Sequence, residues 1–202
     1  MMKLAQFVSV LAHPMFMPSY AFGLLMLCNP YINIMITDSI KQWVFVILTL
    51  FTIILPIISA VLLKRFRIIR SLYMQNAEER IWPFIFTLLW YYMGFQLLSK
   101  LYLPHSILLL MLGAISAIGM ALIITLRWKI SIHMLGIGGV IGAIIGISHR
   151  YQYDHSWLIV GLILFAGIIG FARLKTHSHN YRQVYVGFLI GLITEWAMIL
   201  YF

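Results

Sequence analysis

The sequence predicts an all-α polytopic membrane protein, a transmembrane helical bundle with six to seven spans. The 202-residue chain is 63% hydrophobic and only 9% charged, and its mean hydropathy is +0.99. A soluble domain of this size does not bury so much apolar surface. The apolar residues also fall in runs of about 20, the length that a helix needs to cross a bilayer. Because backbone polar groups in lipid must be paired internally, these runs are helices rather than open strands.

We expect one integral membrane domain over residues 1–202. Its apolar runs predict spans at 15–36, 43–63, 83–101, 105–126, 132–148, 156–172 and 182–201. Residues 2–12 are expected to be a short interfacial helix or an extension of the first span. The fifth and sixth runs are short, so a count of six stays open. Residues 1–63 supply the N-terminal helices, and residues 64–202 form the core that carries the polar motifs.

Charged residues and prolines mark the ends of several spans. The basic stretch 64–67 ends the second span, Arg127 and Lys129 follow the fourth, and Arg173 follows the sixth. Pro83 opens the third span, where the first helical turn needs no N–H donor. These signals predict where the chain leaves the bilayer.

Glycines recur at four-residue spacing in two of the spans. They are Gly138, Gly142 and Gly146 in the fifth span, and Gly187 and Gly191 in the seventh. This spacing puts small residues on one face of a helix, so neighbouring backbones can approach closely. A phosphate cradle is less favoured, because these glycines follow no strand.

The basic residues divide unequally between the two faces. One face carries Lys41, Lys100 and Arg150. The other carries Lys3, Lys64, Arg65, Arg67, Arg70, Arg80, Arg127, Lys129, Arg173, Lys175 and Arg182. The positive-inside tendency therefore predicts that this second face is cytoplasmic. The net charge is +9, and the basic residues that produce it lie mostly in short loops. This distribution indicates contact with anionic membrane lipids rather than nucleic acid.

Three loops on the basic face carry clusters of polar residues, at 78–83, 129–133 and 173–179. Two spans separate each cluster from the next, so an even number of crossings brings all three to one face. Helices begin there, and their N-termini favour anions. Arg80, Lys129 and Arg173 add the cations that phosphate binding needs, and Ser131 adds a hydroxyl donor.

Two histidines of these clusters are candidates for catalysis. One imidazole can act as nucleophile and another as general acid, and His133 and His179 lie on different loops at the same expected depth. His177 is the alternative nucleophile. His13, next to Pro14, lies near the basic face, where a contact with a lipid headgroup is one interpretation and a kink at a helix start is the favoured one. A purely interfacial role is the competing interpretation for each histidine.

The remaining polar residues give weaker predictions about function than these clusters do. No His, Asp or Glu pair stands at i, i+4 within a span, so we expect no metal and no cofactor. Glu195 lies inside the last span, where a carboxyl is a functional hypothesis by default. Snorkelling or an interhelical hydrogen bond is an equal alternative. Cys28 is the one cysteine and forms no intrachain disulfide.

The third cluster resembles a motif of the type-2 phosphatidic acid phosphatase superfamily. That motif has Ser-Arg, five residues, His, three residues and Asp. Here Arg173 is followed after five residues by His179 and after three more by Gln183. Gln183 therefore stands in the place of the Asp, and Ala172 in the place of the Ser.

The other two clusters resemble the remaining motifs. Residues 130–133 are similar to Pro-Ser-Gly-His, and Arg80 with Pro83 resembles the end of a Lys to Arg-Pro motif, with Tyr73 in the place of the Lys. Over most of the chain, the pattern resembles small membrane proteins of Bacteroidetes-type bacteria placed in this superfamily. The resemblance implies a phosphatase-like core in a bacterial inner membrane.

The resemblance also implies roles for individual residues. His179 would attack phosphorus and form a phosphohistidine, His133 would protonate the leaving oxygen, and Gln183 would orient the nucleophile. The phosphoryl oxygens would be held by Arg80, Ser131 and Arg173. Lys129 has no counterpart in the motifs, and its role is inferred from its position.

The expected function is therefore metal-independent hydrolysis of a lipid phosphate or isoprenyl diphosphate. The first alternative is a catalytically degenerate protein that binds anionic lipid, which the changes at Gln183 and Ala172 favour. The second is a small transporter or scaffold subunit. Against a transporter, the sequence shows no inverted repeat and no paired broken helices.

Overall fold

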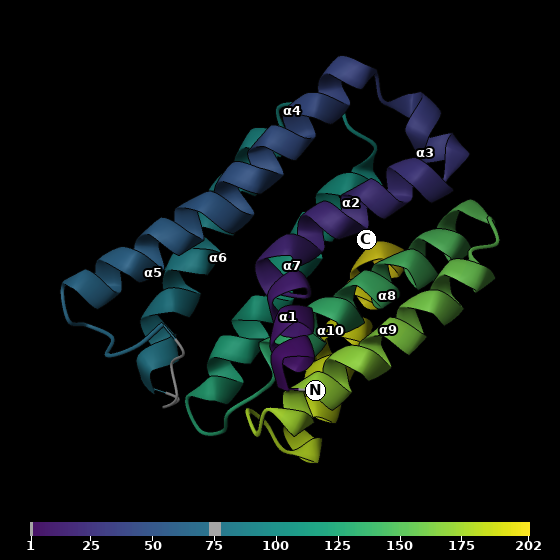
Figure 1. The fold of residues 1–202 in the computed structure, drawn as a ribbon. Coiled ribbons are helices and arrows are strands. Elements are labelled where there is room, and N and C mark those ends of the chain that lie inside the picture. The colour runs from purple at the N-terminus through teal and green to yellow at the C-terminus, as the bar shows by residue number, and fades with distance from the viewer. Residues whose placement is uncertain (1, 73–77) are drawn as a thin grey trace.

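A computed structural model describes residues 2–72 and 78–202 as a bundle of helices (Figure 1). In the described part of the chain, seven helical segments are long and apolar enough to cross a membrane. The chain is therefore an all-α polytopic membrane protein. Tyr73, which stands in the place of the motif Lys, lies outside the described residues. In chain order the elements are α1 (Met2–Leu11), η1 (Pro14–Phe16), α2 (Met17–Cys28), α3 (Pro30–Met35), α4 (Asp38–Leu48), η2 (Thr49–Ile54), α5 (Leu55–Arg65), η3 (Glu78–Arg80), α6 (Ile81–Leu98), α7 (His105–Thr125), α8 (Ile132–Tyr151), α9 (Ser156–Lys175) and α10 (Tyr181–Tyr201).

The first span lies closer to the N-terminus than the sequence predicted. It covers Phe7–Cys28 rather than 15–36. The helix ends because Pro30 lacks the N–H that would bond to the preceding turn. Asn29 then has an extended backbone, and its side-chain oxygen accepts a hydrogen bond from the backbone N–H of Ile32 at 3.0 Å. The residues after Asn29 therefore start a separate short helix.

The first two spans are irregular where they meet. A 3₁₀ turn, η1, separates α1 from α2, and the π-helical segment η2 interrupts the second span beside it. The hydroxyl of Thr52 in η2 donates to the carbonyl oxygen of Met15 in η1 at 3.0 Å. This hydrogen bond holds η1 against η2, and each irregular segment stays within its span, Phe7–Cys28 or Asp38–Arg65. Irregular helical turns of these kinds often occur at functional sites.

Helices α8 and α10 pack against each other through their glycines. A Cβ on Gly146 would lie 3.0 Å from the Cβ of Ile199, and one on Gly187 would lie 2.6 Å from the Ser131 carbonyl oxygen. The spacing of small residues predicted such close packing. The contact also aligns the first turns of the two helices, because the backbone N–H of Ser131 donates to the carbonyl of Gln183 at 3.3 Å.

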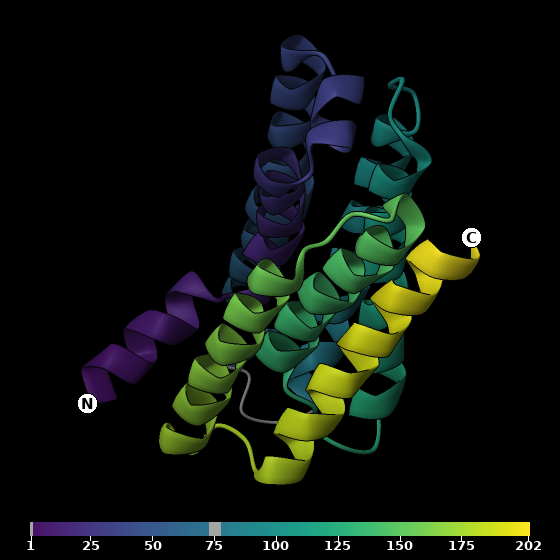
Figure 2. The same ribbon diagram turned by 90° about the vertical axis from the view of Figure 1, so that its right-hand side faces the viewer.

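The three polar loops come together at one end of the bundle (Figures 1 and 2). The α7–α8 and α9–α10 connections and the start of α6 all lie at this end, as the even number of crossings predicted. Helix α1 joins them there by packing against α9. The N-terminal segment therefore lies beside residues that are more than a hundred positions away in sequence.

Candidate functional site

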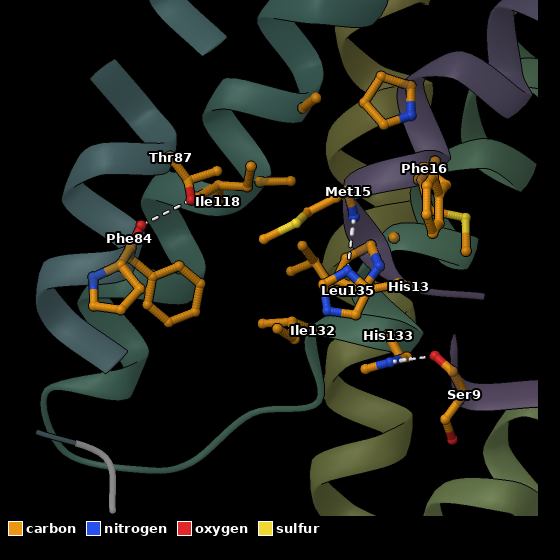
Figure 3. Close-up of a pocket in the computed structure, with 18 of the residues that line it drawn as sticks. Ser9, His13, Met15, Phe16, Phe84, Thr87, Ile118, Ile132, His133 and Leu135 are labelled. Atoms are coloured by element: carbon orange, nitrogen blue, oxygen red, sulfur yellow. Dashed lines mark hydrogen bonds between the residues drawn. The ribbon is translucent and has the colours of Figure 1, made fainter. Parts of the chain in front are cut away.

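A cavity of about 1150 Å³ lies at the basic end of the bundle and continues between the helices. Its polar part includes five of the seven predicted site residues, namely Arg80, Lys129, His133, Arg173 and His179. Its remaining wall is mostly apolar and comes from α2, α5, α6, α7 and α8. Figure 3 shows His133 and His13 near Ser9, across the cavity from Phe84 and Thr87. A polar head and an apolar tail can therefore occupy one continuous space.

The cations come from three different elements. Arg80 ends η3 and is buried, with its Nη1 donating to the Ile130 carbonyl at 3.4 Å. Arg173 lies in the last turn of α9, where a cation is favoured by the helix dipole. Its Nη1 donates to the Ser9 hydroxyl at 3.3 Å, while its Nε is buried and has no hydrogen-bond partner from the described residues.

Lys129 completes the cationic group from the loop before α8. Burial lowers the pKa of its ammonium, and the charges of Arg80 and Arg173 lower that pKa further. Among the described residues, neither Lys129 nor Arg173 forms an ion pair with a carboxylate. Cations held close together in a partly buried site are stabilised by an anion, so this arrangement favours phosphate.

His179 is held in one orientation by the capping of α10. The side chain of Asn180 accepts the backbone N–H of Gln183 at 3.0 Å, and the Gln183 Oε1 accepts the Asn180 N–H at 3.2 Å. This capping box sets the direction of the Gln183 amide. The same Oε1 lies 3.0 Å from His179 Nδ1. Nδ1 must therefore carry the proton, and the lone pair is on Nε2.

The environment of His179 keeps its ring neutral. Its pKa is lowered to about 3, chiefly because burial disfavours the charged ring. The hydrogen bond to Gln183 acts in the opposite direction, and the positive charges of Arg173, Arg80 and Lys129 lower the pKa further. At neutral pH the Nε2 lone pair is available for nucleophilic attack.

His133 lies in the first turn of α8 and bonds to the N-terminal helix. Its Nε2 donates to the Ser9 carbonyl oxygen at 3.0 Å, which assigns the proton to Nε2. Its Nδ1 is buried and has no hydrogen-bond partner among the described residues. The ring is thus held at one nitrogen and can exchange a proton at the other, as an acid–base group requires.

His13 belongs to the site, which the kink interpretation missed. Its Nδ1 does accept the backbone N–H of Met15 at 3.4 Å, so it caps the 3₁₀ turn as a kink residue does. However, its ring also lies against His133, with centroids 5.4 Å apart, and it lines the cavity. The break at His13 and Pro14 was the available signal in the sequence.

Ser131 is placed differently from the prediction. It is fully buried, it is not part of the cavity wall, and its hydroxyl has no hydrogen-bond partner within residues 2–72 and 78–202. The reason is the close approach of α10, whose Gly187 packs directly on the Ser131 carbonyl. The cavity wall instead includes the hydroxyls of Thr176 and Ser178, which lie 2.9 Å apart, together with those of Ser9 and Thr87.

His177, the alternative nucleophile, is exposed and has a left-handed backbone with φ of 51°. No side-chain hydrogen bond within the described residues orients its ring. Nor do three or more His, Cys, Asp or Glu side chains of those residues lie close enough to share a metal ion.

Comparisons with protein-family models, curated proteins and solved structures each give no match. The superfamily resemblance therefore stays a prediction from the sequence patterns.

Proposed function

We propose that the chain is an integral membrane phosphatase that hydrolyses a lipid phosphate or diphosphate through a phosphohistidine. The supporting observation is the state of His179. Its Nδ1–H is held by Gln183, and its Nε2 lone pair belongs to a neutral ring in a cavity lined by Arg80, Lys129 and Arg173. A distant relationship to the type-2 phosphatidic acid phosphatase superfamily is part of this proposal.

In the first step, the His179 Nε2 lone pair forms a bond to phosphorus while the bond from phosphorus to the lipid oxygen breaks. The three cations stabilise the charge on the phosphoryl oxygens. The leaving oxygen takes a proton from Nδ1 of His133. A phosphate monoanion supplies that proton when it enters the cavity, because the neutral His133 ring has an unpartnered acceptor at Nδ1.

In the second step, water attacks the phosphohistidine. Its proton moves to Nδ1 of His133, the phosphorus–nitrogen bond breaks, and the electron pair returns to Nε2 of His179. The products are the lipid alcohol, or lipid monophosphate from a diphosphate, and inorganic phosphate, which takes the proton from Nδ1 of His133 as it leaves and so returns that ring to its neutral form. Gln183 remains the acceptor for Nδ1–H throughout. Because it is neutral, it stabilises the charged ring less than a carboxylate would.

A protein that binds anionic lipid without turnover is the second candidate, and Gln183 is the observation that favours it. Such a protein keeps the cations and the cavity but lacks the carboxylate that stabilises the intermediate. It would retain phospholipid in a salt-sensitive manner and release no phosphate.

We further propose that the basic end faces the cytoplasm of a bacterial inner membrane. The distribution of the 14 Lys and Arg residues supports this sidedness. Labelling of single cysteines introduced at exposed loop positions, in intact cells and in inverted vesicles, tests it. Reaction of the α9–α10 loop from the outside of intact cells would contradict it.

The function is tested by phosphate release from detergent-purified protein with phosphatidate, phosphatidylglycerophosphate and isoprenyl diphosphates. His179→Ala should abolish release. His177→Ala is the matched control, because His177 lies on the same loop and also lines the cavity but is exposed, with no side-chain hydrogen bond to orient its ring among the described residues; this variant should retain activity. Release that persists in His179→Ala would refute this mechanism. Absence of release from every lipid by a folded, lipid-retaining protein would favour the binding function.

A further inference from the structure

Glu195 lies in the wall of the deep part of the cavity, far from the cationic mouth. It is only 6% exposed, and its Oε2 is buried without a hydrogen-bond partner in the part of the chain that the structure describes. No basic side chain of the described residues forms an ion pair with it. An ionised carboxylate without a partner in an apolar interior is very unfavourable. The group is therefore a neutral carboxyl, which offers an O–H donor and a carbonyl acceptor.

Glycines on two neighbouring helices make room for this carboxyl. A Cβ on Gly139 of α8 would lie 3.2 Å from the Glu195 Cγ, and a Cβ on Gly113 of α7 would overlap the carboxyl itself. Alanine at Gly113 would collide with Glu195. The helices are thus shaped around a carboxyl that nothing in the described protein satisfies, and a polar atom of a ligand in the cavity can satisfy it.

The depth of Glu195 indicates which part of a ligand reaches it. Gly139, which contacts Glu195, follows His133 by six positions on α8. At 1.5 Å per residue, the carboxyl lies about 9 Å below His133. In a diacylglycerol phosphate, the ester carbonyl oxygens are about six or seven bonds from phosphorus, roughly 8 Å of extended chain. An isoprenyl chain presents only hydrocarbon at that depth.

We propose that Glu195 is a second polar subsite, whose O–H donates a hydrogen bond to an ester carbonyl of a glycerolipid phosphate. This proposal rests on the proposed function, and it selects acyl-ester lipids over isoprenyl lipids as the substrate class. The cations hold the phosphate, Glu195 holds the ester, and the apolar wall holds the hydrocarbon. A hydrocarbon ligand would leave the carboxyl unpaired and would bind more weakly for that reason.

The test compares a diacylglycerol phosphate with its dialkyl ether analogue, which has the same chains but no carbonyls. Wild-type protein should prefer the ester about fivefold in KM, the effect of one neutral hydrogen bond, with little change in kcat. Glu195→Leu should bring the two lipids to the same KM. Glu195→Gln, whose amide can still donate, should keep the preference. If leucine disturbs the packing of α10, Glu195→Met is the second apolar variant.

Thr87→Val is the matched control. It removes another hydroxyl from the cavity wall, but one that already donates to Pro83 in its own helix at 2.7 Å. It should keep the ester preference. Equal KM values for ester and ether in the wild type, or an unchanged preference in both apolar variants, would overturn the proposal.

The same lipids also separate this proposal from the proposed function. Each lipid is added to the detergent-purified protein, and the rise in Tm reports binding without turnover. If no lipid is hydrolysed, the phosphatase proposal fails. The subsite is still supported if the ester raises Tm more than the ether does and Glu195→Leu removes the difference. The subsite is overturned if ester, ether and isoprenyl phosphate stabilise the protein equally.

Discussion

Replacement of Gln183 by glutamate should increase the rate of the proposed reaction. The two side chains have the same length, so the carboxylate can occupy the position of Oε1, 3.0 Å from His179 Nδ1 and 3.2 Å from the Asn180 N–H. The capping box is kept, since glutamate is favoured at this position of a helix N-terminus. The carboxylate lies behind the imidazole, on the Nδ1 side, whereas phosphate meets Nε2.

The size of the effect follows from the hydrogen bond that changes. A neutral acceptor contributes about 0.5–1.5 kcal/mol and a charged one about 1.5–3 kcal/mol. The gain of about 1.4 kcal/mol for the charged ring corresponds to roughly tenfold in rate. The same energy raises the pKa of His179 by about one unit. Because the pKa of His179 starts at about 3, an increase of about one unit still leaves it well below pH 6. The ring therefore stays neutral above pH 6 and keeps its nucleophilic lone pair.

The assay is phosphate release by Gln183→Glu and by the wild type, with kcat/KM measured between pH 6 and pH 8. The double variant Gln183→Glu, His179→Ala is the control and should be inactive. A folded Gln183→Glu protein with unchanged or lower kcat/KM would refute the assignment of His179 Nδ1 and Gln183 as the orienting pair.

Three further predictions concern the cations, the helix contact and the buried histidine. Arg173→Ala should lower kcat/KM by about two orders of magnitude. The control Arg182→Ala, at an exposed position, should change kcat/KM less than threefold in the same steady-state assay. Equal losses in the two variants would count against a specific phosphate site. Gly142→Val should destabilise the protein by about 1–3 kcal/mol, because the valine side chain would collide with the backbone of α10. The control Gly167→Ala has open space around the new methyl group and should leave the Tm in thermal denaturation unchanged. Because the pKa of His179 is about 3 when folded and about 6.5 when unfolded, the unfolded chain binds more protons between these values. Stability should therefore fall on acidification from pH 6.5 towards pH 4, by at most about 1.4 kcal/mol per pH unit, and His179→Gln should show a smaller fall in Tm over that range.

The local part of the candidate site could be predicted from the sequence. Arg173, His179 and Gln183 lie within eleven consecutive residues, so their spacing along one loop and one helix start largely determines their arrangement. The hydrogen bond between His179 and Gln183 is an i, i+4 contact. Similarly, the number of spans between polar loops was enough to bring those loops to one end of the bundle.

The long-range part of the site could not be predicted in this way. His133 bonds to the Ser9 carbonyl across 124 positions, and Arg173 bonds to the Ser9 hydroxyl across 164. No periodicity or spacing encodes such pairs. They depend on how α1 packs against α9, which also explains why the sequence favoured a kink at His13 over a role in the site.

Hydropathy and charge in the sequence alone determined the fold class, the approximate spans and the end at which the polar loops gather, because lipid requires long apolar helices with polar connections. Tertiary packing alone decided which polar atoms face the cavity. Close contact of α8 with α10 buried Ser131, and the packing of α1 brought Ser9 and His13 to the site. Gly113 of α7 and Gly139 of α8 left space for the Glu195 carboxyl. The physical reason is that hydropathy acts on each segment separately, whereas the surroundings of one side chain depend on contacts between several segments.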